Sequence, residues 1–200
     1  MLRFLVLPYG LGPVEQGFTP ASDLREAGTT IDIEADPASV WHEVVQVPPI
    51  QAHEHGFAWS HMIGFPRPIA ATASGTGVGA LREATFERGV LFVERVTTYV
   101  EQEGLRFSIH ADADTIPARA LDQHVTVGGP YFDVLEGSYM IERLGPQRVR
   151  LHLSSEHRPS TGFNGYASPW TDFIMRDTQE CILEIVARRA ERRALGQPLR

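Results

Sequence analysis

The stretch IDIEADPASVWHEV, residues 31–44, predicts a strand that passes directly into a helix. Polar and apolar side chains alternate in its first part, with the two-residue period of a half-buried strand. Asp36 then supplies an N-cap side chain, and Pro37 occupies the first helical position, where its missing N–H costs nothing. A Pro-Pro pair ends the apolar helical pattern. We therefore predict a strand over 29–35 and a helix over 37–47.

The rest of the sequence predicts a second short helix over 51–62, an antiparallel meander and one long helix. Runs of alternating polarity are separated by turn sequences such as ERG, EQEG and LGPQ. Apolar residues then recur at helical spacing from Ser168, or from Asn164 if the helix continues through Pro169. The predicted strands of the meander span 79–87, 90–101, 104–113, 121–127, 134–144 and 147–157.

This order of elements resembles the START-like superfamily, which includes polyketide cyclase/dehydrase and lipid-transport domains. The resemblance rests on IDIEADPASVWHEV, on the hairpins GVGALREATFERG and GSYMIERLGPQRVRLHLSSEH, and on the final helix. It implies the α+β helix-grip fold, in which a curved antiparallel sheet wraps around a long C-terminal helix and two short helices follow the first strand. It covers residues 29–193, with an N-terminal extension over 1–28 and a tail over 194–200. It also implies an apolar cavity between sheet and helix, where a ligand would bind.

Composition and charge narrow the range of partners. A chain of 200 residues with 42% hydrophobic content is long enough for one domain with its own core. Its formal net charge of -7 repels phosphate backbones, and no stripe of Lys or Arg is interleaved with aromatic residues. We therefore expect no nucleic-acid partner.

The cysteine and histidine patterns argue against metal chemistry. Cys181 is the single cysteine and lies in an apolar helical pattern, which excludes disulfides and predicts a buried thiol. In HEHGFAWSH, residues 53–61, a helical conformation would turn His53 and His55 away from each other. We expect neither a metal nor another cofactor, and a reducing, cytoplasmic location.

The N-terminal extension contains the short apolar run FLVLPYGLGPVE, residues 4–15. Crossing a bilayer needs roughly 20 apolar residues, and no signal-peptide cleavage pattern follows the run. The segment either packs on the domain, trails from it, or is the remnant of a membrane-proximal region. Some START-like relatives carry the domain after transmembrane helices, so membrane association through this or a missing segment is an open alternative.

One predicted hairpin places two opposite charges on an apolar face. If residues 87–89 form a three-residue turn with a left-handed glycine, Arg82 faces Glu94 across the two strands. A two-residue turn would place Glu83 opposite Glu94, which like-charge repulsion disfavours. Phe92 and the other residues on the same face of the strand as Glu94 are mainly apolar, so the pair faces the core. It is either a structural ion pair, the commoner case, or a polar anchor for a ligand.

Further candidate site residues occupy strand positions whose side chains should also face the core. Tyr139 could direct its hydroxyl into the cavity, or it could be an ordinary core aromatic. Ser155 and His157 could form a polar mouth, but the sequence shows no acid to orient a Ser–His nucleophile. Trp59 and Phe173 could line one end of the cavity, although plain core packing explains them equally well.

These observations favour a binding domain that carries a small hydrophobic ligand, such as a lipid or a polyketide-like molecule. The rival from another class is an aromatase/cyclase or dehydratase, in which Glu94, Tyr139 or His157 moves protons on a bound carbonyl compound. A third interpretation is a partner-binding module of a membrane-associated protein that uses an apolar surface around residues 4–18.

Overall fold

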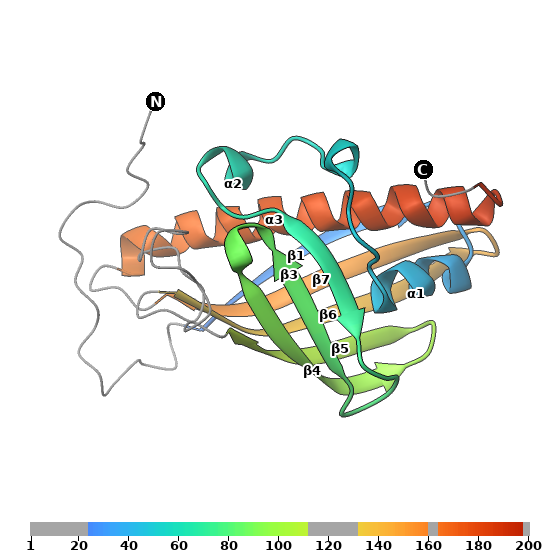
Figure 1. The fold of residues 1–200 in the computed structure, drawn as a ribbon, viewed down its shortest axis with the longest axis horizontal. Helices are drawn as coiled ribbons and strands as arrows, with labels where there is room; N and C mark the ends of the chain where they lie inside the picture. Colours follow the sequence, from blue (N-terminus) through green and yellow to red (C-terminus); the bar gives the residue numbers. More distant parts are fainter. Residues whose placement is uncertain (1–23, 112–131, 160–163, 198–200) are drawn as a thin grey trace.

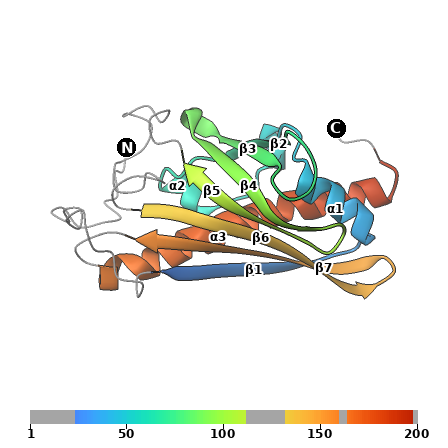
Figure 2. The ribbon, with the colours of Figure 1, turned by 90° about the horizontal axis from the view of Figure 1, so that it is seen from below.

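The computed structural model describes residues 24–111, 132–159 and 164–197. Within these residues, one seven-stranded antiparallel sheet has the order β1-β7-β6-β5-β4-β3-β2 and curves around helix α3 (Figures 1 and 2). This arrangement confirms the predicted helix-grip fold. The elements are β1 (Arg25–Ile33), α1 (Pro37–Val45), α2 (Trp59–Met62), β2 (Pro68–Ala73), β3 (Leu81–Phe86), β4 (Leu91–Val100), β5 (Gly104–Ala111), β6 (Phe132–Gly145), β7 (Arg148–Pro159) and α3 (Asn164–Ala194).

The strand-to-helix junction has the predicted capped geometry. The Asp36 Oδ1 atom accepts hydrogen bonds from the backbone N–H groups of Ala38 at 2.9 Å and Ser39 at 3.0 Å. These bonds satisfy two of the N–H groups that a helix start leaves unpaired. Trp41, on the following turn, is buried against Tyr99 with 5.2 Å between the ring centroids, so it belongs to the core.

Strand β2 is an element that the sequence analysis missed. It lies at one edge of the sheet and pairs with β3 along its length. Its sequence, PIAATA, begins with proline, which is tolerated at the first residue of a strand. Small alanine side chains also hide the two-residue period that revealed the other strands.

The predicted helix over 51–62 is wrong in its central part. A short 3-10 turn spans Ala52–Glu54, and α2 forms only over Trp59–Met62. Gly56 separates the two, because a glycine in mid-helix sacrifices backbone entropy. The other boundaries differ less, with β1 beginning at Arg25 rather than 29. The predicted strand over 121–127 lies outside the described residues.

Helix α3 packs against β1, β7 and α1, on the inner face of the sheet (Figure 2). Cys181, on α3, is buried as predicted, and burial raises the pKa of its thiol. Apolar side chains from the sheet, α1 and α3 form the main core. Its largest fully buried members include Ile33, Val40, Val44, Val149, Leu151 and Leu183.

A buried ion pair anchors the connection between α1 and β2 on α3. Arg189 donates from Nε and Nη2 to the two carboxylate oxygens of Glu54, each at 2.7 Å. The same guanidinium also donates to the carbonyl oxygens of Pro48 at 2.9 Å and Pro49 at 3.1 Å. The hydrogen bonds from Arg189 lower the pKa of Glu54 to about 2. One arginine therefore fixes a long connection that has little regular structure.

The Glu54 pair predicts a loss of stability in acid. Because the pKa is lower in the folded chain than the usual 4.5, the stabilisation is complete above that value and is lost as the pH falls toward 2. A shift of this size corresponds to about 3 kcal/mol. We expect Glu54→Gln to lower the free energy of unfolding by about that amount at pH 7, and to flatten its decline between pH 5 and pH 2.

Urea unfolding measured across this pH range tests the prediction. Glu184→Gln is the matched control. Glu184 forms an exposed ion pair with Arg188 at 3.3 Å on α3, the helix that carries Arg189. The control should change stability by less than about 1 kcal/mol. Equal losses for the two variants would contradict the anchoring role of Glu54.

Candidate functional site

The predicted cross-strand pair of Arg82 and Glu94 is present. Arg82 on β3 and Glu94 on β4 are directly opposite in the register of the two strands. The turn between the strands has Gly89 in the left-handed region, with φ of 78°, as the three-residue turn required. Arg88 also has a positive φ, of 63°. The turn chemistry therefore set the register that brings the two charges together.

The Arg82–Glu94 pair is buried but incompletely hydrogen-bonded. The Arg82 Nε and Glu94 Oε2 atoms are 3.2 Å apart, and the two residues are only 4% and 6% exposed. Among the described residues, Arg82 Nε and Nη1 and Glu94 Oε2 have no hydrogen-bond partner. Buried polar atoms are nearly always paired, since leaving one unpaired costs roughly 1–3 kcal/mol. These atoms mark a place where a polar group from outside the chain would be stabilised.

The surroundings of this pair are apolar and aromatic. The Arg82 Cζ atom lies 5.2 Å from the ring centroid of Phe107, within the range of a cation–π contact. Along the strands, Phe92 on one side and Val96 on the other belong to two separate apolar clusters of the core. The pair thus lies between these clusters on the inner face of the sheet.

Tyr139 on β6 completes a polar group that we call the inner polar site, defined as Arg82, Glu94 and Tyr139. Burial raises the pKa of the Tyr139 hydroxyl, while the nearby Arg82 guanidinium lowers it and Glu94 raises it. Burial also raises the pKa of Glu94, and the charge of Arg82 opposes that rise. The site therefore combines a guanidinium with two groups that burial favours in their protonated forms.

A glycine makes room for the aromatic floor of this site. Gly137 on β6 is opposite Phe107 on β5, and a Cβ atom at position 137 would lie 2.7 Å from two carbons of the Phe107 ring. The ring would have to shift, and with it the support beneath the Arg82 guanidinium. Gly137 is thus required by close packing.

We expect Gly137→Ala to destabilise the protein by about 1–3 kcal/mol through overpacking. Gly145→Ala is the control, because a Cβ atom there would meet nothing within 4 Å. Thermal and urea unfolding of the two variants should separate them clearly. A Gly137→Ala variant as stable as the control would show that the Phe107 ring relocates without cost.

Ser155 and His157, predicted to form a polar mouth, instead hold α3 on the sheet. The Gln179 side chain on α3 donates to the Ser155 hydroxyl at 2.8 Å. The Nε2 atom of His157 is 3.1 Å from Asp172 Oδ1, and Arg25 also donates to Asp172. Asp172 could not be recognised from the sequence as the acid beside His157, because it lies on a different element.

The His157 imidazole is fully buried. Burial lowers its pKa, and the Asp172 carboxylate opposes this. The pKa of Asp172 is lowered, mainly by its hydrogen bond from Arg25. Together these groups connect the start of β1, the end of β7 and the first half of α3.

Two of the predicted lining residues lie at the surface instead. Trp59 is 57% exposed and Phe173 is 44% exposed. Helix α2 has four residues, too few to bury an aromatic face beneath it. Phe92, by contrast, is buried on the inner face as expected.

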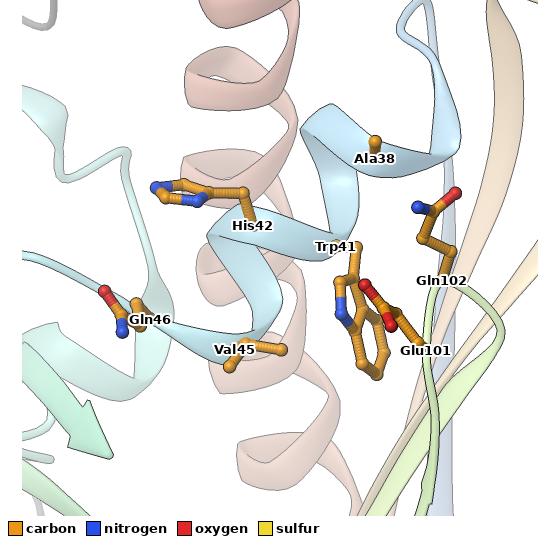
Figure 3. A pocket seen from close by; sticks show the side chains of 7 residues that line it. All are labelled: Ala38, Trp41, His42, Val45, Gln46, Glu101 and Gln102. Atoms are coloured by element: carbon orange, nitrogen blue, oxygen red, sulfur yellow. The ribbon is translucent and has the colours of Figure 1, made fainter. Parts of the chain in front are cut away.

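A shallow surface pocket of about 260 Å³ lies between α1 and the β4–β5 turn (Figure 3). The Trp41 ring extends from α1 toward the turn and lies beside Glu101. The lining of this pocket contains none of the predicted site residues. Its lining residues are Ala38, Trp41, His42, Val45, Gln46, Glu101 and Gln102.

Within residues 24–111, 132–159 and 164–197, no cluster of three or more His, Cys, Asp or Glu side chains could hold a metal ion. His55 and His61 lie edge to face, with 6.4 Å between ring centroids. In the same part of the chain, no helix has the length and apolar character needed to cross a membrane.

Several solved structures resemble this chain in fold. The Zhui aromatase/cyclase from a Streptomyces species has a TM-score of 0.53 at 14% identity, over 88% of this chain and 99% of that one. A Thermus thermophilus protein has a TM-score of 0.51 at 14% identity, over 83% and 97%. The chain shares the helix-grip fold of these structures. Norcoclaurine synthase from Thalictrum flavum matches with a TM-score of 0.49 at 11% identity, over 94% and 99%. No protein-family model and no curated protein matches the sequence.

The helix-grip fold explains the position of the inner polar site. In this fold the curved sheet and the long helix enclose the interior between them, and the inner polar site lies on the sheet side of that interior. At these sequence identities the likeness concerns the fold alone, so any chemistry must be argued from this chain's own residues.

Substitutions in the buried pair test whether it is coupled. We expect Arg82→Met to destabilise the protein by about 3–5 kcal/mol, because Glu94 loses its buried counter-charge. The double variant Arg82→Met/Glu94→Leu should recover most of that loss, since two apolar side chains need no partners. Arg150→Met, which removes an exposed pair with Asp32, should cost less than about 1 kcal/mol. Additive effects in urea unfolding would show that the pair is not coupled.

Proposed function

We propose that this START-like chain binds a small, mainly apolar molecule between the inner face of the sheet and α3. The observation that carries the proposal is the set of unpaired polar atoms on Arg82 and Glu94 in an apolar interior. A purely structural ion pair would be expected to use its N–H groups within the protein. Here Arg82 Nε and Nη1 are buried with no hydrogen-bond partner among the described residues, so a ligand oxygen beside them would find donors.

The chemistry of the pair suggests which ligands fit. The Arg82 guanidinium can donate to a carbonyl, carboxylate or hydroxyl oxygen, and Glu94 can accept from a hydroxyl. The neighbouring Phe92 and Phe107 rings favour a hydrocarbon or aromatic body. A lipid or a polyketide-like molecule, with one polar group on a large apolar body, has this combination.

An aromatase/cyclase or dehydratase activity is the second candidate. Burial raises the pKa of Glu94, and a carboxyl group with a raised pKa can transfer a proton near neutral pH. Arg82 would bind the carbonyl oxygen of the substrate, and Glu94 or Tyr139 would move the proton. His157 is fully buried and bound by Asp172, so we assign it a structural role. The similar Streptomyces structure is that of an aromatase/cyclase, which agrees with this candidate at the level of fold.

The third interpretation, a partner-binding module that uses residues 4–18, concerns a segment outside the described residues. It makes no use of the inner polar site. Binding inside the domain is therefore the proposal that the described residues support best.

Native mass spectrometry of the freshly purified protein is the first test. We expect an additional mass that organic extraction releases as a small hydrophobic molecule. Binding of the aromatic probe 8-anilinonaphthalene-1-sulfonate then tests the site. The double variant Arg82→Met/Glu94→Leu should bind this sulfonate at least about tenfold more weakly, the loss typical of one charged hydrogen bond.

Arg150→Met should bind the probe like the wild type, and near-ultraviolet circular dichroism should show that all variants are folded. Equal probe affinity in wild type and double variant would refute the anchoring role of the pair. Glu94→Gln separates binding from catalysis once a ligand is identified. A catalytic Glu94 predicts lost turnover with retained binding, and unchanged turnover would exclude Glu94 as the proton-transfer group.

A further inference from the structure

A group of large apolar side chains is exposed around α2. Phe57, Trp59 and Met62 are 70%, 57% and 70% exposed. Exposed apolar residues are ordinary when scattered, whereas a contiguous group usually marks a binding surface. We define the α2 patch as Phe57, Trp59, Met62, Ile63, Trp170 and Phe173, all of which are exposed.

Contacts between α2 and α3 make these residues one surface. The Asp177 carboxylate on α3 accepts hydrogen bonds from the backbone N–H groups of Trp59 at 3.1 Å and Ser60 at 2.6 Å. Trp170 and Phe173 precede Asp177 at helical spacing, so they share its face of α3. Phe57 packs edge to face on Trp59, with 5.1 Å between ring centroids. The patch therefore extends across both helices.

Exposed arginines border the α2 patch. Arg67 follows α2 in sequence, and Arg88 donates from Nη1 to the carbonyl oxygen of Gly64 at 2.9 Å, next to the end of α2. Arg176 is one helical turn beyond Phe173 and is also exposed. These cations are notable because the whole chain has a net charge of -7.

The nearest carboxylates are partly occupied by backbone contacts. Asp177 caps α2, and Glu87 Oε2 accepts from the backbone N–H of Arg67 at 3.3 Å. Glu180 and Glu184 are exposed acids that continue the same face of α3, and Glu184 is paired with Arg188. The edge of the patch nearest α2 therefore presents arginine side chains beside its aromatic residues.

We propose that the α2 patch docks on the surface of an anionic lipid bilayer. Tryptophan and phenylalanine favour the boundary between headgroups and acyl chains, and arginine complements anionic headgroups. Figure 1 shows α2 at the margin of the molecule, outside α3, where a short projecting helix can enter a deformable interface. This surface is separate from the inner polar site, so the proposal does not depend on a bound ligand.

Co-sedimentation of the full chain with lipid vesicles tests the proposal. Vesicles of equal parts phosphatidylcholine and phosphatidylglycerol should bind the wild type, and vesicles of phosphatidylcholine alone should bind it less. High salt should weaken binding to the anionic vesicles. Trp59→Ser and Met62→Ser should each weaken it at least about tenfold, because each removes a large apolar contact. Arg67→Glu should weaken it in anionic vesicles only.

Met140→Ser is the matched control, since Met140 is 54% exposed but lies on β6, away from α2. It should bind vesicles like the wild type. Absence of wild-type binding, or equal losses for Met62→Ser and Met140→Ser, would overturn the proposal. A concentration-dependent dimer that Trp59→Ser abolishes, seen by sedimentation without lipid, would also overturn it in favour of a second copy of the chain.

Discussion

The seven-stranded sheet has an apolar inner face that must be kept from water, and the packing of α3 against that face organises the rest of the chain. Apolar side chains supply most of the attraction, but it is non-directional and does not define where along the sheet the helix sits. Polar contacts determine the position of the helix along the sheet. Gln179 binds Ser155, and Asp172 joins His157 to Arg25. Such contacts fix the helix at one end of the fold.

The other end of α3 is positioned by a different kind of contact. Arg189 binds Glu54 and two proline carbonyl groups, so it organises a connection that has little secondary structure. Asp177 caps α2 from the same helix. Helix α2 is therefore held on α3 through its backbone N–H groups, while its apolar side chains remain exposed. A surface suited to docking can thus exist without destabilising the core.

The inner polar site differs from these structural contacts in one respect. Glu54 has its charge satisfied by Arg189, whereas Arg82 and Glu94 have atoms with no partner among the described residues. Burying an incompletely paired charge costs free energy, and a functional use would explain why the fold carries that cost. The two roles that we propose are therefore separate: the interior of the fold would bind a small molecule, and the α2 patch would bind a membrane surface.

The sequence by itself determined the elements whose causes are local. Alternating polarity marked most strands, Asp36 and Pro37 marked the start of α1, and the turn at 87–89 set the register of Arg82 opposite Glu94. These features depend on residues within one or two turns of the chain, so their patterns are visible in sequence.

Tertiary structure alone decided the rest. The pairs of Glu54 with Arg189, separated by 135 residues, and of His157 with Asp172, 15 residues apart on different elements, follow no sequence period. Trp59 and Phe173 have the chemistry of core residues, but exposure depends on what packs over a side chain. The packing of the sheet and the helices decides which polar atoms form hydrogen bonds and which apolar side chains are buried. These contacts join segments that are far apart in sequence, so no sequence period predicts them.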